Sequence, residues 1–168
     1  MIHVCSLARL HATVHETGAR HIVTLLKHTD RVERPQHILE KNHLVLGMDD
    51  ISMPLEGYII PCEDHVDKLI SFVRAWDRTK PLVMHCFAGI SRSTAGAYVA
   101  ACALNAGRSE LAIAHELRRA SPTATPNARI VSLADSILAR EGRMVAAIES
   151  IGRGMIAEEG HPFRLDLE

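Results

Sequence analysis

Short apolar runs and polar stretches alternate along the first fifty residues, which predicts strands separated by helical or looped connections. The apolar runs cover Ile2–Leu7, His21–Leu26 and His43–Met48, and their lengths are typical of buried strands. A helical connection that closes at Gly18 is expected between the first two. Residues 30–41 are polar and predict a loop or a short helix. The pattern therefore predicts that the chain opens with a β-α-β unit.

The middle of the chain predicts a loop, an amphipathic helix and a buried strand. Proline and glycine interrupt Ile51–Pro61, which is typical of an exposed loop. A helix is expected to take Pro61 as its first residue and to end before Pro81. The apolar run Leu82–His85 then predicts a short parallel strand. The apolar positions of the helix recur at helical spacing and are Val66, Leu69, Ile70, Val73 and Trp76.

Helical patterns predominate after this strand. Ser93–Leu104 consists almost entirely of small and apolar residues, so we expect a helix that is buried on most sides. Three further helices are expected, each with a capping residue or a sharp change of pattern at its start. They run from the N-cap Ser109 to Arg119, from Thr125 to Gly142 and from Arg143 to Ile156.

The order of these elements predicts one domain of the α/β class. A chain of 168 residues is long enough to bury a core without disulfides or metals. Residues 158–168 show no apolar periodicity, so we predict a single domain over 1–157 and a loose C-terminal tail over 158–168. Strands that alternate with helices predict three layers, in which helices flank both faces of a mainly parallel central sheet.

Charge and cysteine content exclude several classes of partner. Basic and acidic residues nearly cancel, 19 against 20, so no global field attracts nucleic acid or an anionic membrane, and we expect neither partner. Any anion site must be local. The chain has no long uncharged apolar run and no basic leader, and its four cysteines lie far apart. We therefore expect a cytoplasmic protein with reduced thiols.

The eleven histidines do not form a metal-binding pattern. His11 and His15 are four residues apart, and Cys62 and His65 are three apart, but neither pair has a third ligand nearby in sequence. We interpret them as ordinary surface or core residues and expect neither a metal nor a cofactor. Arg118 falls in the last turn of a predicted helix, where positive charge favours the helix dipole without any ligand.

The segment from His85 to Thr94 carries the candidate chemistry. Cys86 follows a buried strand, and Gly89 allows a turn before the next helix. A cysteine nucleophile acts as the thiolate and therefore needs an electropositive setting. Unpaired amides at a helix start, together with the helix dipole, supply such a setting for a thiolate and for a phosphate alike. The residues expected to form this phosphate-binding loop are Phe87, Ala88, Gly89, Ile90, Ser91 and Arg92.

Side chains after the turn extend this interpretation. Arg92 begins the helix six positions after Cys86, and its planar fork can bind two phosphoryl oxygens at once. Ser93 and Thr94 are hydroxyls near the cysteine, and a hydrogen bond from one of them would make sulfur a better leaving group. His85, which precedes the cysteine, is expected to support the loop.

The run His-Cys-x5-Arg-Ser resembles the signature of the protein tyrosine phosphatase superfamily, and Ala-Gly-x-Ser-Arg-Ser resembles its dual-specificity branch. This resemblance implies a phosphocysteine on Cys86, oxyanion binding by Arg92 and the loop amides, and an aspartic acid that protonates the leaving oxygen. That acid lies upstream on a separate loop. The matching position is the Asp49-Asp50 pair at the end of a predicted strand. We prefer Asp50 and keep Asp49 open, because one residue of register decides which carboxylate faces the site.

The expected activity is hydrolysis of a phosphate monoester, either in a phosphorylated protein or in a small molecule. The loop has no lysine, which disfavours highly charged lipid headgroups. Phosphotyrosine and phosphoserine or phosphothreonine both remain as substrates. An alternative is a phosphate-recognition module that keeps the loop without productive turnover. Rhodaneses and arsenate reductases rank lower because their loops differ in length or lie near the N-terminus.

Overall fold

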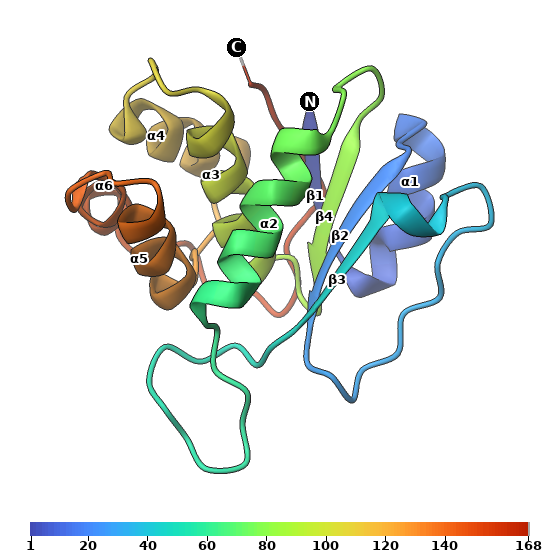
Figure 1. The fold of residues 1–168 in the computed structure, drawn as a ribbon, viewed down its shortest axis with the longest axis horizontal. Coiled ribbons are helices and arrows are strands. Elements are labelled where there is room, and N and C mark those ends of the chain that lie inside the picture. Colours follow the sequence, from blue (N-terminus) through green and yellow to red (C-terminus); the bar gives the residue numbers. More distant parts are fainter. Residues whose placement is uncertain (168) are drawn as a thin grey trace.

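A five-stranded sheet forms the centre of the computed structural model, which describes residues 1–167 (Figure 1). The strands are β1 (Ile2–Ser6), β2 (His21–Leu26), β3 (His43–Gly47), β4 (Leu82–Cys86) and β5 (Phe163–Leu165). The helices are α1 (Leu10–Thr17), α2 (Glu63–Ala75), α3 (Arg92–Leu104), α4 (Glu110–Ala120), α5 (Ala128–Ile137) and α6 (Arg143–Ile151). Two short 3-10 turns, η1 (Leu7–Arg9) and η2 (Glu40–Asn42), precede α1 and β3.

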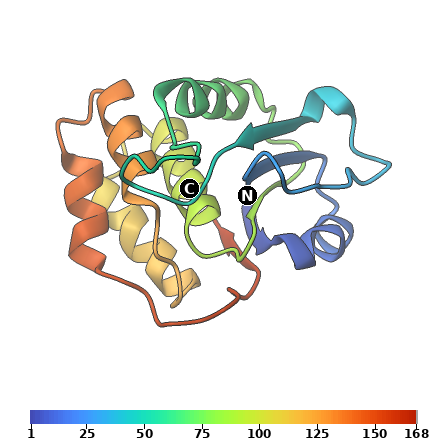
Figure 2. The ribbon, with the colours of Figure 1, turned by 90° about the horizontal axis from the view of Figure 1, so that it is seen from below.

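The sheet places Cys86 at the end of a central strand. The strand order is β3-β2-β4-β1-β5, in which the first four strands are parallel and β5 is antiparallel to β1. Every residue of β4 is buried, and Cys86 pairs in register with Ser6 of β1. Ligands of parallel α/β sheets bind beyond the carboxyl ends of the strands. The loop between β3 and α2 lies on this same side of the sheet, which Figure 2 views from below.

Helices cover both faces of the sheet and enclose two hydrophobic cores (Figure 1). On one face, Leu10 and Val14 of α1 pack against Ile22 of β2 and Val83 of β4. The other core lies under the remaining helices, and α3 is buried along its length from Arg92 to Cys102. The small residues of α3 allow this close packing, as the sequence predicts. The structure therefore confirms the predicted three-layer α/β fold.

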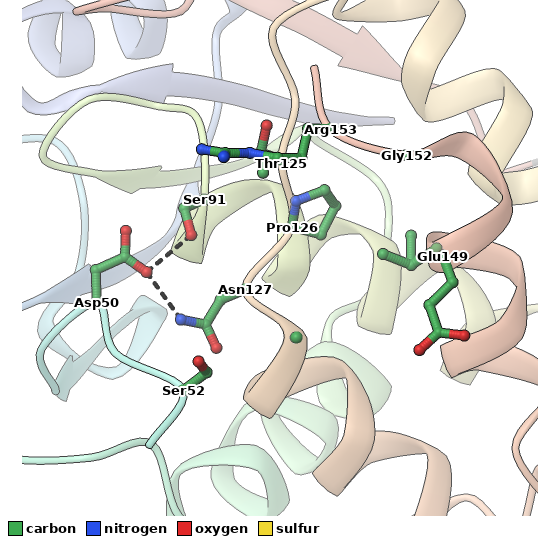
Figure 3. Close-up of a pocket in the computed structure, with 11 residues that line it drawn as sticks. Asp50, Ser52, Ser91, Thr125, Pro126, Asn127, Glu149, Gly152 and Arg153 are labelled. Atoms are coloured by element: carbon green, nitrogen blue, oxygen red, sulfur yellow. Dashed lines mark hydrogen bonds between the residues drawn. The ribbon is translucent and has the colours of Figure 1, made fainter. Parts of the chain in front are cut away.

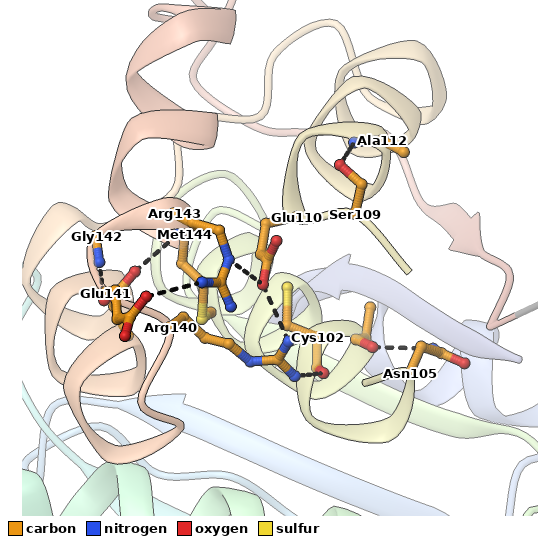
Figure 4. Close-up of polar contacts among 12 residues, drawn as sticks. Cys102, Asn105, Ser109, Glu110, Ala112, Arg140, Glu141, Gly142, Arg143 and Met144 are labelled. Atoms are coloured by element: carbon orange, nitrogen blue, oxygen red, sulfur yellow. Dashed lines mark hydrogen bonds and ion pairs between the residues drawn. The ribbon is translucent and has the colours of Figure 1, made fainter. Parts of the chain in front are cut away.

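A buried ion cluster joins the helices of the larger core (Figure 4). The carboxylate of Glu110 lies 3.0 Å from Nη1 of Arg140 and 3.4 Å from Nε of Arg143. Arg140 also donates a 2.9 Å hydrogen bond to the carbonyl of Cys102. These contacts connect the start of α4 with α3 and with the turn between α5 and α6, so a largely buried carboxylate has two arginine partners.

Three helices begin or end at other residues than the sequence predicts. The helix expected from Pro61 begins at Glu63, because Cys62 is its N-cap and its amide donates a 3.2 Å hydrogen bond to Nδ1 of His65. The helix expected over 125–142 begins at Ala128 and ends at Ile137. It ends early because the carboxylate of Asp135 accepts the amides of Gly142 and Met144, each at 2.7 Å, which folds the chain back.

The third difference concerns the C-terminal helix and the segment after it. The helix expected to reach Ile156 ends at Ile151. We predicted a loose tail over 158–168, yet Phe163–Leu165 form β5 beside β1. Three residues are too few to show a periodic pattern, and the strand is stabilised by pairing with the edge of β1. The division between a 1–157 domain and a 158–168 tail stays a prediction.

No helix formed by residues 1–167 combines the length and the apolar character needed to cross a membrane.

Candidate active site

The loop from Cys86 to Arg92 connects the end of β4 to the start of α3, and we call it the phosphate loop. The Cys86 side chain lies inside it and is 2% exposed. Its Sγ accepts a hydrogen bond from the amide of Gly89 at 3.3 Å and lies 3.1 Å from the hydroxyl of Ser93. Both contacts stabilise negative charge on sulfur when the hydroxyl donates.

Segments outside the phosphate loop hold its carbonyl groups facing outward. Because the C=O and N–H of one trans peptide unit point in opposite directions, each outward carbonyl turns the amide of the next residue toward the inside of the loop. The contact from Gly89 to Cys86 is one such amide. The outward bonds are Leu7 N to Phe87 O at 3.1 Å, Gly160 N to Ala88 O at 2.9 Å, Thr125 N to Ile90 O at 2.9 Å and Asn127 N to Ser91 O at 3.3 Å.

Gly89 allows this loop to lie directly against β1. Its φ of +73° is in the left-handed region, and an added Cβ would lie 2.8 Å from both the Cys5 carbonyl carbon and the Ser6 nitrogen. Side chains rarely adopt that φ, and real Cβ atoms do not approach backbone so closely. The position therefore accepts only glycine without a shift of the loop or the strand.

Arg92 is buried with part of its guanidinium unpaired. The side chain is 7% exposed, and Nη1 donates a 2.9 Å hydrogen bond to the carbonyl of Met48, the residue after β3. Its Nε is buried and has no hydrogen-bond partner within residues 1–167. A buried N–H without a partner is costly. An oxyanion bound in the phosphate loop would satisfy it, so the guanidinium is suited to hold phosphate.

The two hydroxyls after Arg92 have different positions. Ser93 contacts the sulfur, whereas the Thr94 hydroxyl donates to the carbonyls of Ile90 at 2.5 Å and Ser91 at 2.9 Å. The sequence left open which hydroxyl faces Cys86, and the structure places Ser93 there. Thr94 instead connects the phosphate loop to the first turn of α3.

His85 lies behind the loop in a buried hydrogen-bonded chain. Its Nε2 is 2.7 Å from the hydroxyl of Thr24, which is also 2.8 Å from Nε2 of His43. Burial, as the largest cause, lowers the pKa of His85 from 6.5 to about 4. The imidazole is therefore neutral at physiological pH and supports the strand that carries Cys86 without adding charge.

The two aspartates after β3 have different partners, and Figure 3 shows those of Asp50. Asp50 is exposed, and its Oδ1 accepts hydrogen bonds from the Ser91 hydroxyl and from Nδ2 of Asn127, both at 2.8 Å. The Asp49 side chain is buried, and its Oδ2 accepts the amide of Ile59 at 2.8 Å. Asp50 therefore faces the phosphate loop, whereas Asp49 braces the loop that follows β3.

Asn127 is a site residue whose role the sequence did not indicate. Its Nδ2 donates to Asp50, while its Oδ1 accepts the amides of Arg129 and Ile130 and caps α5. A proline followed by asparagine before a helical pattern is the local signal for such a cap. The contact with Asp50 has no local signal, because it joins residues 77 positions apart.

Arg118 has a structural role beyond the helix-dipole effect expected from sequence. Its guanidinium joins the end of α6 to the loop before α5, and all its hydrogen bonds go to backbone carbonyls of these two segments. The bonds run from Nη1 to the carbonyls of Ile151 at 3.2 Å and Arg153 at 3.1 Å, and from Nη2 to those of Ala124 at 2.7 Å and Gly152 at 2.9 Å.

Surfaces beside the phosphate loop are open to solvent. The Phe87 side chain is 64% exposed and lines a shallow cavity with Leu7 and Ala8. On the other side lies a cavity of about 480 Å³ that includes Asp50 and Ser91 (Figure 3).

Within residues 1–167 no group of three His, Cys, Asp or Glu side chains is placed to hold a metal ion. The contact of Cys62 with His65 lies at the start of α2 instead.

A family model of phosphatases matches more than half of this chain. Residues 5–108 match the family model described as polymorphic toxin system, DSP-PTPase phosphatase. No curated protein sequence matches the chain.

Solved structures share the fold at low sequence identity. The DUSP15 structure is 18% identical over 94% of each chain, with a TM-score of 0.65. Human DUSP28 is 17% identical over 90% of this chain and 95% of its own, with a TM-score of 0.61. The human tyrosine phosphatase-like serine/threonine/tyrosine-interacting protein is 19% identical over 82% and 87%, with a TM-score of 0.58.

Proposed function

Because the chain belongs to the DSP-PTPase family, the dual-specificity branch of the protein tyrosine phosphatase superfamily, we propose that it hydrolyses phosphate monoesters through a phosphocysteine on Cys86. The observation that carries this proposal is the convergence of donors on one sulfur. The Gly89 amide and the Ser93 hydroxyl contact Sγ of Cys86. The unpaired Nε of Arg92 supplies a further donor for a phosphoryl oxygen.

In the first displacement, the Cys86 thiolate attacks phosphorus in line with the ester oxygen. A sulfur–phosphorus bond forms as the phosphorus–oxygen bond breaks, and Asp50 gives its proton to the departing oxygen. The negative charge on the phosphoryl oxygens meets the loop amides and the guanidinium of Arg92, which are already oriented before the substrate arrives. Asp50 has a defined position for this role because Ser91 and Asn127 hold its Oδ1.

In the second displacement, water attacks the phosphocysteine and the sulfur leaves as thiolate. The carboxylate of Asp50, now deprotonated, takes a proton from the attacking water. Ser93 donates its hydroxyl to the leaving sulfur, since it lies 3.1 Å from Sγ. Inorganic phosphate departs, and both the thiolate and the protonated Asp50 are restored for the next turnover.

The proposed substrates are phosphorylated proteins, with phosphotyrosine and phosphoserine or phosphothreonine as target groups, and small phosphomonoesters. The phosphate loop has no lysine, which supports substrates of moderate charge over multiply phosphorylated lipid headgroups. The net charge of −1 supports the absence of nucleic-acid and membrane partners. Four unpaired thiols support action in the reducing cytoplasm.

The proposal is tested by hydrolysis of p-nitrophenyl phosphate by the wild type and by Cys86→Ser. Wild-type turnover that falls to background in the serine variant is the expected result. Tungstate, a tetrahedral oxyanion, should bind the wild type and protect Cys86 from alkylation by iodoacetamide. A wild type that is no faster than Cys86→Ser, while both bind tungstate, would replace the enzyme with a phosphate-recognition module.

A further inference from the structure

The cavity beside Asp50 continues the proposed active site away from the phosphate loop. Asp50 and Ser91 belong to both, so a substrate whose phosphate lies against Cys86 extends naturally into this space (Figure 3). Its volume is about 480 Å³, which is enough for one or two side chains of a peptide. The remaining lining includes Pro126, Ile148, Glu149 and Arg153.

The backbone around Arg153 is attached to the phosphate loop through a short chain of hydrogen bonds. Gly154 donates its amide to the hydroxyl of Thr125 at 3.1 Å, and Thr125 donates its own amide to the carbonyl of Ile90 at 2.9 Å. On the other side, Arg118 holds the carbonyl of Arg153 at 3.1 Å. The Cα of Arg153 therefore has a fixed position relative to the nucleophile, although its side chain is exposed.

The guanidinium of Arg153 has no hydrogen bond or ion pair with any other residue of the described chain, 1–167. In Figure 3 its side chain extends toward the Ser91 end of the cavity, whereas the carboxylate of Glu149 lies at the opposite end. Asp50 is the acid of the proposed reaction, and Arg153 adds positive charge at this end of the cavity, beyond that of Arg92 in the phosphate loop. A free guanidinium fork is suited to bind a carboxylate or a phosphate with two hydrogen bonds.

We propose that Arg153 forms a second anion subsite, and that the preferred substrates are phosphoproteins with another anionic side chain within a few residues of the target phosphate. This inference rests on the proposed function and specifies its substrate class. The anion is either the carboxylate of an acidic residue or a second phosphorylated residue, because both present the same oxygen geometry to arginine. Arg153 is a specificity residue, since the reacting atoms lie at Cys86.

The test uses phosphotyrosine peptides that differ at one neighbouring position, which holds alanine, glutamate or phosphoserine in turn. The position is moved from three residues before to three after the phosphotyrosine. At the best position, the wild type should prefer an anionic peptide over the alanine peptide by roughly fivefold in kcat/KM. The glutamate and phosphoserine peptides show which source of the anion is recognised.

Variants assign the preference to one side chain. Arg153→Ala should reduce the ratio of kcat/KM between the two peptides to about one, and Arg153→Glu should invert it. Glu149→Gln, at the other end of the same cavity, is the matched control and should keep the ratio. Each ratio compares two substrates of one enzyme, so a change in overall activity does not affect it.

A binding measurement separates this inference from the proposed function. The Cys86→Ser variant is titrated with the same peptides, and the ratio of their Kd values should again favour the anionic peptide and be lost in Cys86→Ser/Arg153→Ala. Equal values for all peptides in both measurements would overturn the subsite even if the enzyme turns over p-nitrophenyl phosphate. A preference in Kd without any turnover would support the subsite and overturn the catalytic proposal.

Discussion

Asn127 donates a 2.8 Å hydrogen bond to Oδ1 of Asp50 and so joins the start of α5 to the segment after β3. Ser91 of the phosphate loop donates to the same oxygen. Both bonds occupy one carboxylate oxygen, which leaves Oδ2 of Asp50 as the oxygen that can carry the proton for a leaving group. Asp49 has a different partner, the amide of Ile59, so adjacent acids in the sequence have different surroundings.

We expect Asp50→Asn to slow turnover of phenyl phosphate by about a hundredfold, because asparagine has no proton to give the leaving oxygen. The effect should be smaller for p-nitrophenyl phosphate, whose leaving group departs without help. Asp49→Asn is the matched control and should lose less than about tenfold on either substrate. A larger loss in Asp49→Asn would assign the acid role to Asp49, and equal losses in the two variants would contradict a specific role for Asp50.

Ser93→Ala should slow the breakdown of the phosphocysteine. The hydroxyl lies 3.1 Å from Sγ, and loss of a hydrogen bond to a leaving thiolate is expected to slow that step roughly tenfold. Rapid mixing with p-nitrophenyl phosphate should then show a burst of product close to one equivalent of enzyme. Thr94→Ser keeps the hydroxyl that bonds Ile90 and should show no new burst, and the absence of a burst in Ser93→Ala would remove this role.

Gly89→Ala should both destabilise the protein and abolish tungstate binding. The cost combines the φ of +73° with a Cβ placed 2.8 Å from the backbone of β1, and we expect about 2–4 kcal/mol by urea denaturation. Gly18→Ala is the matched control, because Gly18 has a similar φ of +66° but open space around it. It should cost only about 1 kcal/mol, and a similar cost in the two variants would contradict the close approach to β1.

His85 should make the protein less stable in acid. The folded chain holds its pKa at about 4, against 6.5 for an ordinary histidine, chiefly through burial. Its neutral form therefore contributes fully above pH 6.5, and this contribution falls as the pH drops toward 4. We expect a loss of about 2 kcal/mol between pH 8 and pH 5 from this group.

The measurement is urea denaturation of the wild type and His85→Gln at both pH values. Other histidines whose pKa is lowered by burial titrate in both proteins, so the difference between the two pH dependences reports mainly on His85. The slope should be shallower in His85→Gln. Identical slopes would mean that His85 is protonated in the folded protein near pH 6.

The sheet could be predicted from sequence wherever an apolar run carried the signal. His21–Leu26 is predicted with the same ends that the structure shows, because a buried parallel strand is apolar throughout. Phe163–Leu165 escaped prediction since its three residues become a strand only through pairing with β1. The early end of α5 also depends on a contact at a distance, the carboxylate of Asp135 on the amide of Met144.

In the candidate site, too, local patterns could be predicted from sequence and contacts between distant residues could not. The phosphate loop is local, so the spacing of Cys86, Gly89 and Arg92 along the chain is enough to indicate a phosphate site. The roles of Asn127 and Arg118 depend on contacts between segments far apart in the chain, which no short motif encodes. Which of Asp49 and Asp50 faces the phosphate loop depends on the register of the chain after β3, and the sequence does not give that register.

The outward carbonyls of the phosphate loop set an upper limit on how much of this chain a protein engineer can remove. Their donors are the amides of Leu7, Thr125, Asn127 and Gly160, and only the first belongs to the segment 5–108 that matches the family model. A shortened chain that ended at that boundary would lose three of these donors. The Ala88 carbonyl would then have no partner, whereas the carbonyls of Ile90 and Ser91 would keep only their bonds within the loop and α3, such as those from the Thr94 hydroxyl. New termini or inserted domains are therefore best placed at loops where they keep the segment of Thr125 and Asn127, and the segment of Gly160, in the same chain as the phosphate loop.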